Sequence, residues 1–166
     1  KRLHTVLEAA ERLPDIRFAI AGDVPLKGEV EAAAARLDNL DYIGWLTRPQ
    51  LLQQMDAADA LVLPSELESF GNVALEAMGR ARIAVVTATC GIVNWPGLVE
   101  HMVVFELETP LWQVLGELNE WPPERRIALS EAASRAARKL NHDSLLQWRR
   151  LLAPQSHHDS GPDPES

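Results

Sequence analysis

The chain contains only one cysteine, Cys90, among its 166 residues. A lone cysteine cannot form a disulfide within the chain, and this cysteine usage is typical of proteins kept in a reducing cytoplasm. We interpret Cys90 as a small packed side chain rather than a nucleophile. The cysteine count therefore predicts a cytoplasmic protein.

Long apolar segments are also missing. No run approaches the roughly 20 apolar residues that a membrane-spanning helix requires, and no segment has the pattern of a signal peptide. The chain begins with Lys1 rather than Met and enters a helical pattern at once. We therefore expect it to be part of a longer polypeptide.

Positive charge is in deficit. The 24 acidic residues outnumber the 16 Lys and Arg residues, so the net charge is -8. This balance disfavours nucleic acid or an anionic membrane as the main partner, because both would repel the chain as a whole. We expect no nucleic-acid partner.

Two motifs that mark other functions are absent. The chain has no Gly-x-Gly-x-x-Gly segment, which disfavours a nicotinamide-binding domain. His157 and His158 have no cysteine or acidic partner at a useful spacing, so we predict no metal site. The sequence offers no positive signal for a receiver-type domain either.

What is present is an alternation of short apolar runs with amphipathic segments. This order predicts an α/β fold, namely a Rossmann-like, doubly wound parallel sheet. We expect one domain over residues 1–152 and a disordered tail over residues 153–166, which are rich in Pro, Ser, His and Asp. The expected strands are 16–21, 41–44, 59–63, 83–87 and 103–105, and the expected helices are 2–13, 27–37, 49–58, 72–78, 109–119, 123–139 and 144–152.

The stretch from residue 61 to residue 78 carries the strongest chemical signal. It reads as a buried strand, a polar loop and a helix, with Asn72 as the expected N-cap. The free amides at the helix start suit a phosphate, and carboxylates beside it, from Glu68 and Glu76, suit sugar hydroxyls. The pattern thus indicates a nucleotide-sugar pocket, although an ordinary strand–loop–helix with solvated acids is an alternative of similar weight.

The residues of this stretch read Pro-Ser-x-x-Glu-x-Phe-Gly-x-x-x-Leu-Glu-Ala-Met. This sequence resembles the Glu-x7-Glu signature of retaining glycosyltransferases of the GT-B fold. It is most similar to group 1 (family 4). The preceding run from Ala58-Asp59 to Pro64-Ser65 also matches that family. The resemblance covers the order of elements to about residue 150 and implies the C-terminal, donor-binding half of a GT-B fold.

The resemblance implies roles for the central stretch. Glu76 would hold the ribose of the donor, and Glu68 would lie near the donor sugar as the catalytic residue. The segment between them would contact sugar and phosphate through Ser69, Phe70, Gly71, Asn72 and Val73.

The resemblance also points to donor-binding positions elsewhere. Lys1 would neutralise the diphosphate, Gly22 would let the backbone approach the ligand, and Gly44 and Trp45 would meet the nucleobase. The alternatives are an exposed terminal lysine, an ordinary turn glycine and a buried structural tryptophan. For Trp45 we expect the buried, structural role.

The family relationship implies a hexosyltransferase that uses a UDP-, GDP- or ADP-sugar, retains the anomeric configuration and needs no metal or other cofactor. The acceptor domain is missing from this chain, so we expect the fragment alone to be inactive. Peripheral membrane contact of a full-length enzyme is compatible with the resemblance.

The chain departs from the family pattern at Ala81, where a glycine is usual, at Ile83, where a proline is usual, and over residues 99–102, where a glycine-rich segment is usual. These departures leave an alternative, which is a degenerate or stand-alone nucleotide-binding module without catalytic activity.

Overall fold

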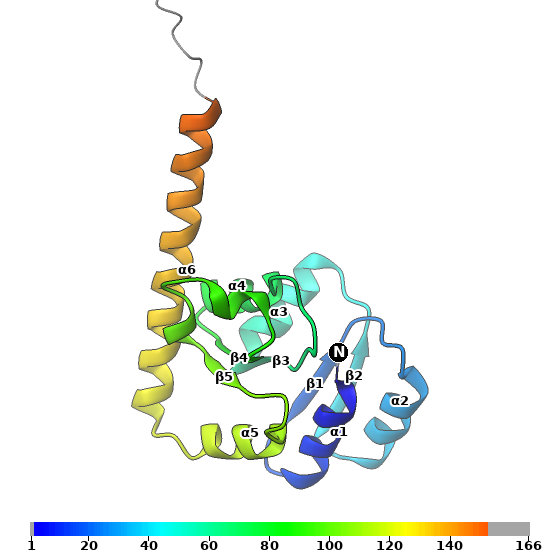
Figure 1. Ribbon diagram of the computed structural model, residues 1–166. Coiled ribbons are helices and arrows are strands. Elements are labelled where there is room, and N and C mark those ends of the chain that lie inside the picture. Colours follow the sequence, from blue (N-terminus) through cyan, green and yellow to red (C-terminus); the bar gives the residue numbers. More distant parts are fainter. Residues whose placement is uncertain (1, 153–166) are drawn as a thin grey trace, which may run out of the picture.

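The computed structural model describes residues 2–152 and has the α/β, Rossmann-like fold class expected (Figure 1). Strands and helices alternate, and the expected strands are all present, those at 83–87 and 103–105 with unchanged bounds. The strands are β1 (Phe18–Ala21), β2 (Leu40–Gly44), β3 (Ala60–Leu63), β4 (Ile83–Thr87) and β5 (Val103–Phe105). The helices are α1 (Leu3–Arg12), α2 (Lys27–Arg36), α3 (Arg48–Ala57), α4 (Asn72–Gly79), α5 (Leu111–Asn119) and α6 (Pro123–Leu152), with short 3-10 turns η1 (Gly91–Asn94) and η2 (Val99–His101).

All strand pairs are parallel, but the hydrogen bonds divide the strands into two sheets. β1 pairs with β2 in one sheet, and β3, β4 and β5 follow one another in the other. Parallel strands require crossover connections, and here helices supply most of them. Because the strands are parallel, the loops that follow them emerge at the same edge, where ligands bind in folds of this kind.

Two hydrophobic cores lie on opposite faces of β4, whose five residues are all buried. Ile83 and Val85 join a core formed with α1, α2 and α5, whereas Ala84 and Val86 join a core formed with α4 and α6. A strand covered on both faces reads as a continuous apolar run, which explains why its bounds were predictable. The two-sided covering is the doubly wound arrangement.

The turn between α4 and β4 contains the only non-glycine residue with a positive φ within the described part of the chain. Ala81 has φ 56°, in the left-handed region that favours glycine. Its N–H bonds to the carbonyl of Met78, and the N–H of Arg82 bonds to that of Ala77, so the turn closes the helix tightly. Ala81, one of the positions at which the sequence departs from the family pattern, therefore has a strained backbone.

We expect Ala81→Gly to raise the free energy of unfolding by about 1 kcal/mol, because glycine adopts this conformation without the steric penalty of a Cβ. Urea unfolding of both proteins would measure the change. Ala35→Gly, in the exposed part of α2, is a matched control and should lower stability by about 1 kcal/mol. A decrease in both variants would contradict the assignment of strain to Ala81.

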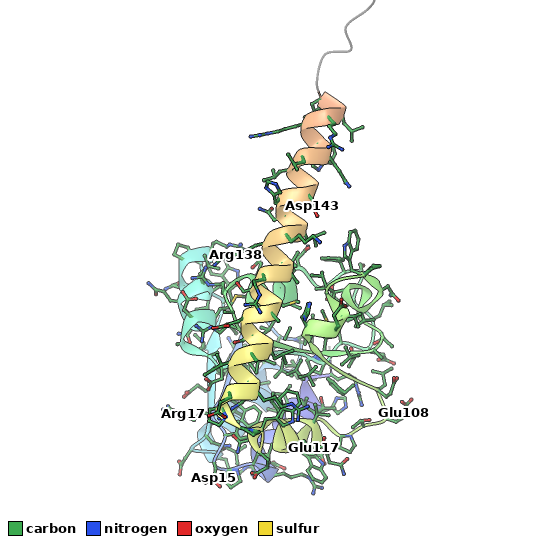
Figure 2. The ribbon with its side chains drawn as sticks, turned by 90° about the vertical axis from the view of Figure 1, so that its left-hand side faces the viewer. Asp15, Arg17, Glu108, Glu117, Arg138 and Asp143 are labelled. Carbon is green, nitrogen blue, oxygen red and sulfur yellow. The ribbon has the colours of Figure 1, made fainter. Side chains whose placement is uncertain are left out.

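The last helix differs from the sequence expectation. Residues 123–139 and 144–152 were expected as separate helices, but α6 continues unbroken for 30 residues. Three of the four intervening residues, Asn141, His142 and Asp143, are weak helix formers, but none is Gly or Pro, and so a continuing helix remains favourable. Figure 2 shows α6 extending past the body beyond Arg138.

The face of α6 that is buried at Ala133 and Ala137 continues into this extension as exposed apolar side chains. Among them, Trp148 is 61% exposed and Leu152 is 76% exposed. In residues 2–152 no helix has the length and apolar character needed to cross a membrane. The tail expected over 153–166 lies outside the described residues.

Candidate functional site

The loops that follow β1, β2, β3 and β4 lie at the same edge of the fold, as parallel strands require. The N–H of Gly22 donates to the carbonyl of Gly44 at 2.6 Å, so these two predicted positions are adjacent. The N–H of Arg2 donates to the carbonyl of Pro64 at 3.2 Å, which ties the start of α1 to the end of β3. Lys1 itself lies outside the described residues, but its neighbour thus lies beside the central motif.

The loop between β3 and α4 is held by the loop that follows β4. The N–H of Gly91 donates to the carbonyl of Glu68 at 2.9 Å, and the N–H of Ile92 donates to that of Phe70 at 2.7 Å. A Cβ on Gly91 would lie 1.9 Å from the carbonyl oxygen of Ser69. The two backbones are therefore in direct contact, and this contact fixes the conformation of the loop between β3 and α4.

Cys90 lies beneath the contact between the two loops. Its thiol is fully buried and donates to the carbonyl of Phe70 at 3.3 Å. Burial raises the pKa of the thiol; the hydrogen bond from Ile92 opposes this shift, and the nearby charge of Glu68 adds to it. The packed, unreactive role expected for Cys90 agrees with this environment.

The N-cap of helix α4 lies one residue earlier than expected. The predicted N-cap, Asn72, is wrong, because Gly71 occupies that position with φ 98° and Asn72 is the first helical residue. The carbonyl of Gly71 accepts from the N–H groups of Ala74 and Leu75. Helix geometry leaves the N–H groups of Asn72 and Val73 without an intrahelical partner, so they can bind an anion.

The two acidic residues bracket this helix start. Glu68 is half-buried in the loop, and the side chain of Glu76, 29% exposed, lies one turn into α4. Glu76 accepts two bonds from Nη1 of Arg48, at 2.9 Å to Oε1 and 3.0 Å to Oε2. Arg48 was not among the predicted site residues. The spacing of Thr47 and Gln50, which is typical of a helix N-terminus, could have placed it at the start of α3.

Aromatic residues on this edge are more accessible than expected. The buried, structural role expected for Trp45 is wrong, because this residue follows Gly44 in an open loop and is 74% exposed. Phe70 packs edge-on against Trp95, with ring centroids 5.6 Å apart. Trp95 was not assigned from the sequence, since its contact with Phe70 arises from the meeting of two loops.

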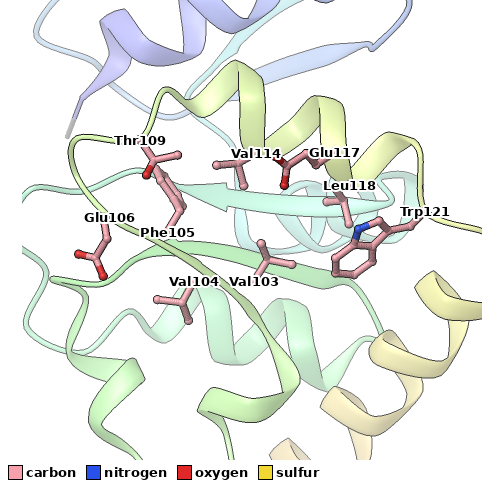
Figure 3. Close-up of a pocket in the computed structure, with 9 residues that line it drawn as sticks. All are labelled: Val103, Val104, Phe105, Glu106, Thr109, Val114, Glu117, Leu118 and Trp121. Carbon is pink, nitrogen blue, oxygen red and sulfur yellow. The ribbon is translucent and has the colours of Figure 1, made fainter.

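A separate hollow lies along β5, an outer strand of the larger sheet (Figure 3). It has a volume of about 310 Å³ and contains none of the predicted site residues. Its walls are mainly apolar, with two acidic side chains, and come from β5 and α5. The lining residues are Val103, Val104, Phe105, Glu106, Thr109, Val114, Glu117, Leu118 and Trp121.

Comparison with protein families identifies a match over the first part of the chain. The family model described as glycosyl transferases group 1 matches residues 1–95. Those residues include both acidic residues of the motif, the start of α4 and the β2–α3 loop.

Curated relatives match about half of the chain. Sulfoquinovosyl transferase SQD2 of Arabidopsis thaliana is 34% identical over 91 residues, which are 55% of this chain and 18% of that protein. D-inositol 3-phosphate glycosyltransferase of Mycobacteroides abscessus is 35% identical over 95 residues, covering 52% and 21%. The matched segment thus spans about a fifth of these relatives.

Solved structures share the fold over nearly the whole chain. HepE of Anabaena, solved in complex with UDP and glucose, has a TM-score of 0.68 at 19% identity, covering 92% of this chain and 45% of that chain. WaaG, a glycosyltransferase involved in lipopolysaccharide biosynthesis, has a TM-score of 0.67 at 24% identity, covering 93% and 44%. This chain therefore corresponds to less than half of either protein.

Proposed function

The chain belongs to the glycosyl transferases of group 1, and from this premise we propose that it is the donor-binding part of a sugar-transferring enzyme. It would be the C-terminal half of a retaining GT-B enzyme of family 4. The donor would be a UDP-, GDP- or ADP-sugar. The observation that carries the proposal is the placement of Glu68 and Glu76 on either side of the α4 N-terminus.

The parts of this edge suit the parts of a nucleotide sugar. The free N–H groups of Asn72 and Val73 would bind the diphosphate, with Lys1 as an additional cation. Glu76 would accept hydrogen bonds from the ribose hydroxyls, as an acid does in dinucleotide-binding folds. The exposed face of Trp45 and the neighbouring backbone of Gly44 and Gly22 would contact the base, and Glu68 would orient the donor sugar.

In the reaction, negative charge develops on the departing diphosphate. Amides fixed at the start of α4 would stabilise this charge without having to reorganise. The hydrogen bonds from Gly91 to Glu68 and from Ile92 to Phe70, which join the two loops, would keep those amides in place. The proposal also includes three further features of the reaction. The sugar is transferred with retention of its anomeric configuration, no metal ion is needed, and a further domain binds the acceptor.

The proposal predicts that a nucleoside diphosphate stabilises the chain and that this effect depends on Glu76. Saturation at a hundred times the dissociation constant stabilises a folded protein by about 2.7 kcal/mol. We therefore expect one of UDP, GDP and ADP to raise the melting temperature by several degrees. Glu76→Ala should lose this shift, whereas Glu68→Ala should keep it, because Glu68 faces the sugar rather than the nucleotide.

Thermal-shift titration of the three proteins with the three nucleotides would make this measurement. A cooperative melt without a shift from any nucleotide would contradict donor binding and favour a module with a structural role. Equal shifts for the parent and Glu76→Ala would refute the ribose assignment.

A further inference from the structure

The ion pair between Arg48 and Glu76 joins helices α3 and α4, which follow the two loops that the proposed donor site needs together. Arg48 is the first residue of α3 and follows the loop of Gly44 and Trp45, whereas Glu76 belongs to α4. A single nitrogen of Arg48, Nη1, bonds to both carboxylate oxygens of Glu76, at 2.9 and 3.0 Å. This arrangement fixes where the carboxylate lies and the direction in which it points.

The position of Arg48 is itself determined by its neighbours. The N–H and the hydroxyl of Thr47 donate to Oε1 of Gln50, at 2.9 and 2.7 Å. These bonds define the first turn of α3, which carries Arg48. The side chain thus begins from an ordered backbone even though it is 62% exposed.

The same two helices are joined by a second ion pair of reversed polarity. Arg80, just after α4, bonds to the carboxylate of Asp56 near the end of α3, and this hydrogen bond lowers the pKa of Asp56. The second pair already links α3 to α4, away from the motif loop. The Arg48–Glu76 pair is therefore not required merely to hold the helices together.

The contribution of the Arg48–Glu76 pair to stability should be small, since exposed ion pairs contribute little. The pair also leaves Glu76 able to bind a ligand. A carboxylate offers about four acceptor positions, Arg48 occupies one position on each oxygen, and the side chain of Glu76 remains 29% exposed. The geometry favours orientation of the carboxylate over obstruction of it.

We propose that Arg48 is a positioning residue for nucleotide binding, which holds the carboxylate of Glu76 toward the ribose hydroxyls. This inference rests on the proposed function, in which Glu76 is the ribose acceptor. It adds that recognition of the ribose depends on the first residue of α3, which follows the loop of Gly44 and Trp45. A nucleotide that lacks one ribose hydroxyl is the ligand that tests this dependence directly.

The test compares UDP, GDP and ADP with their 2′-deoxy forms by calorimetric titration of four proteins. These are the parent chain, Arg48→Met, Arg48→Lys and Arg80→Met. A hydrogen bond to a charged group corresponds to a preference of about ten- to a hundredfold, and we expect the parent chain to prefer the ribonucleotide by about this factor. In Arg48→Met the preference should fall to about threefold or less, because the carboxylate loses its orientation.

The other two variants separate positioning from stability. Arg48→Lys should keep most of the preference, because both bonds to Glu76 come from one nitrogen and an ammonium group can replace it. Arg80→Met removes the other α3–α4 pair and should leave the preference unchanged. Thermal melts of all four proteins would show that each is folded.

The outcomes distinguish this inference from the function on which it rests. An unchanged preference in Arg48→Met, with binding still lost in Glu76→Ala, would overturn the positioning role alone. Tighter binding by Arg48→Met would show that Arg48 competes with the nucleotide, and equal losses in Arg48→Met and Arg80→Met would show a purely structural effect. Absence of binding by the parent chain would overturn both proposals.

Discussion

Gly91→Ala is expected to lower the free energy of unfolding by about 3 kcal/mol, through overpacking and the weakening of two backbone hydrogen bonds. The added Cβ would lie 1.9 Å from the carbonyl oxygen of Ser69 and 2.7 Å from its carbonyl carbon. Backbone cannot rotate away as a flexible side chain can. The two loops would therefore have to separate, and the bonds from Gly91 to Glu68 and from Ile92 to Phe70 would lengthen.

Urea unfolding would measure this loss, and a thermal melt should show a fall of roughly 10 °C. Gly28→Ala is the matched control, because nothing lies within 4 Å of its added Cβ and it belongs to helix α2. This control should raise stability by about 0.5–1 kcal/mol. Equal stability of Gly91→Ala and the parent would refute the close contact of the loops.

Gly71→Ala is the second substitution with a large expected effect. Gly71 has φ 98° and precedes α4, and a Cβ there would lie 2.7 Å from Sγ of Cys90. The conformational penalty for a residue with a Cβ is about 1–2 kcal/mol, and the steric overlap in a packed region adds about 1–3 kcal/mol. We expect a total loss of about 3 kcal/mol and weaker nucleotide binding, because the free amides of α4 would move.

A double-mutant cycle separates the two contributions. Removing the sulfur with Cys90→Ala should relieve the steric part, so Gly71→Ala should destabilise that background by about 1–2 kcal/mol only. Urea unfolding of the parent, both single variants and the double variant would provide the cycle. Additive effects would show that Cys90 does not oppose the Cβ and would contradict the packing described for the loop.

The elements that were predicted closely are those set by local pattern. β4 and β5 have the predicted bounds because each is a short, mainly apolar run in which β-branched residues predominate. Residues 123–152 form one helix rather than the two that were predicted, although Asn141, His142 and Asp143 are weak helix formers. Residues 140–143 contain no Gly or Pro, and the helix is anchored by the packing of Ala133 and Ala137 against the rest of the fold, so it continues through these residues.

The site was predictable in part. The motif placed Glu68 and Glu76 around a helix start because a strand, a loop and a helix follow one another in a short stretch. The structure moves the N-cap from Asn72 to Gly71, since the backbone there is left-handed. Arg48 was missed because it lies 28 positions from Glu76, and no local pattern reports contacts between separate helices.

The sequence by itself determined the succession of strands and helices, the parallel α/β class and the acidic motif at one edge, because these depend on residues near one another in the chain. Tertiary structure alone decided which side chains complete that edge. The approach of Gly91 to Ser69, the contact of Phe70 with Trp95 and the orientation of Glu76 by Arg48 depend on how loops and helices pack across the sheet. Such contacts are selected by shape and distance in the folded chain, and local propensity does not encode them.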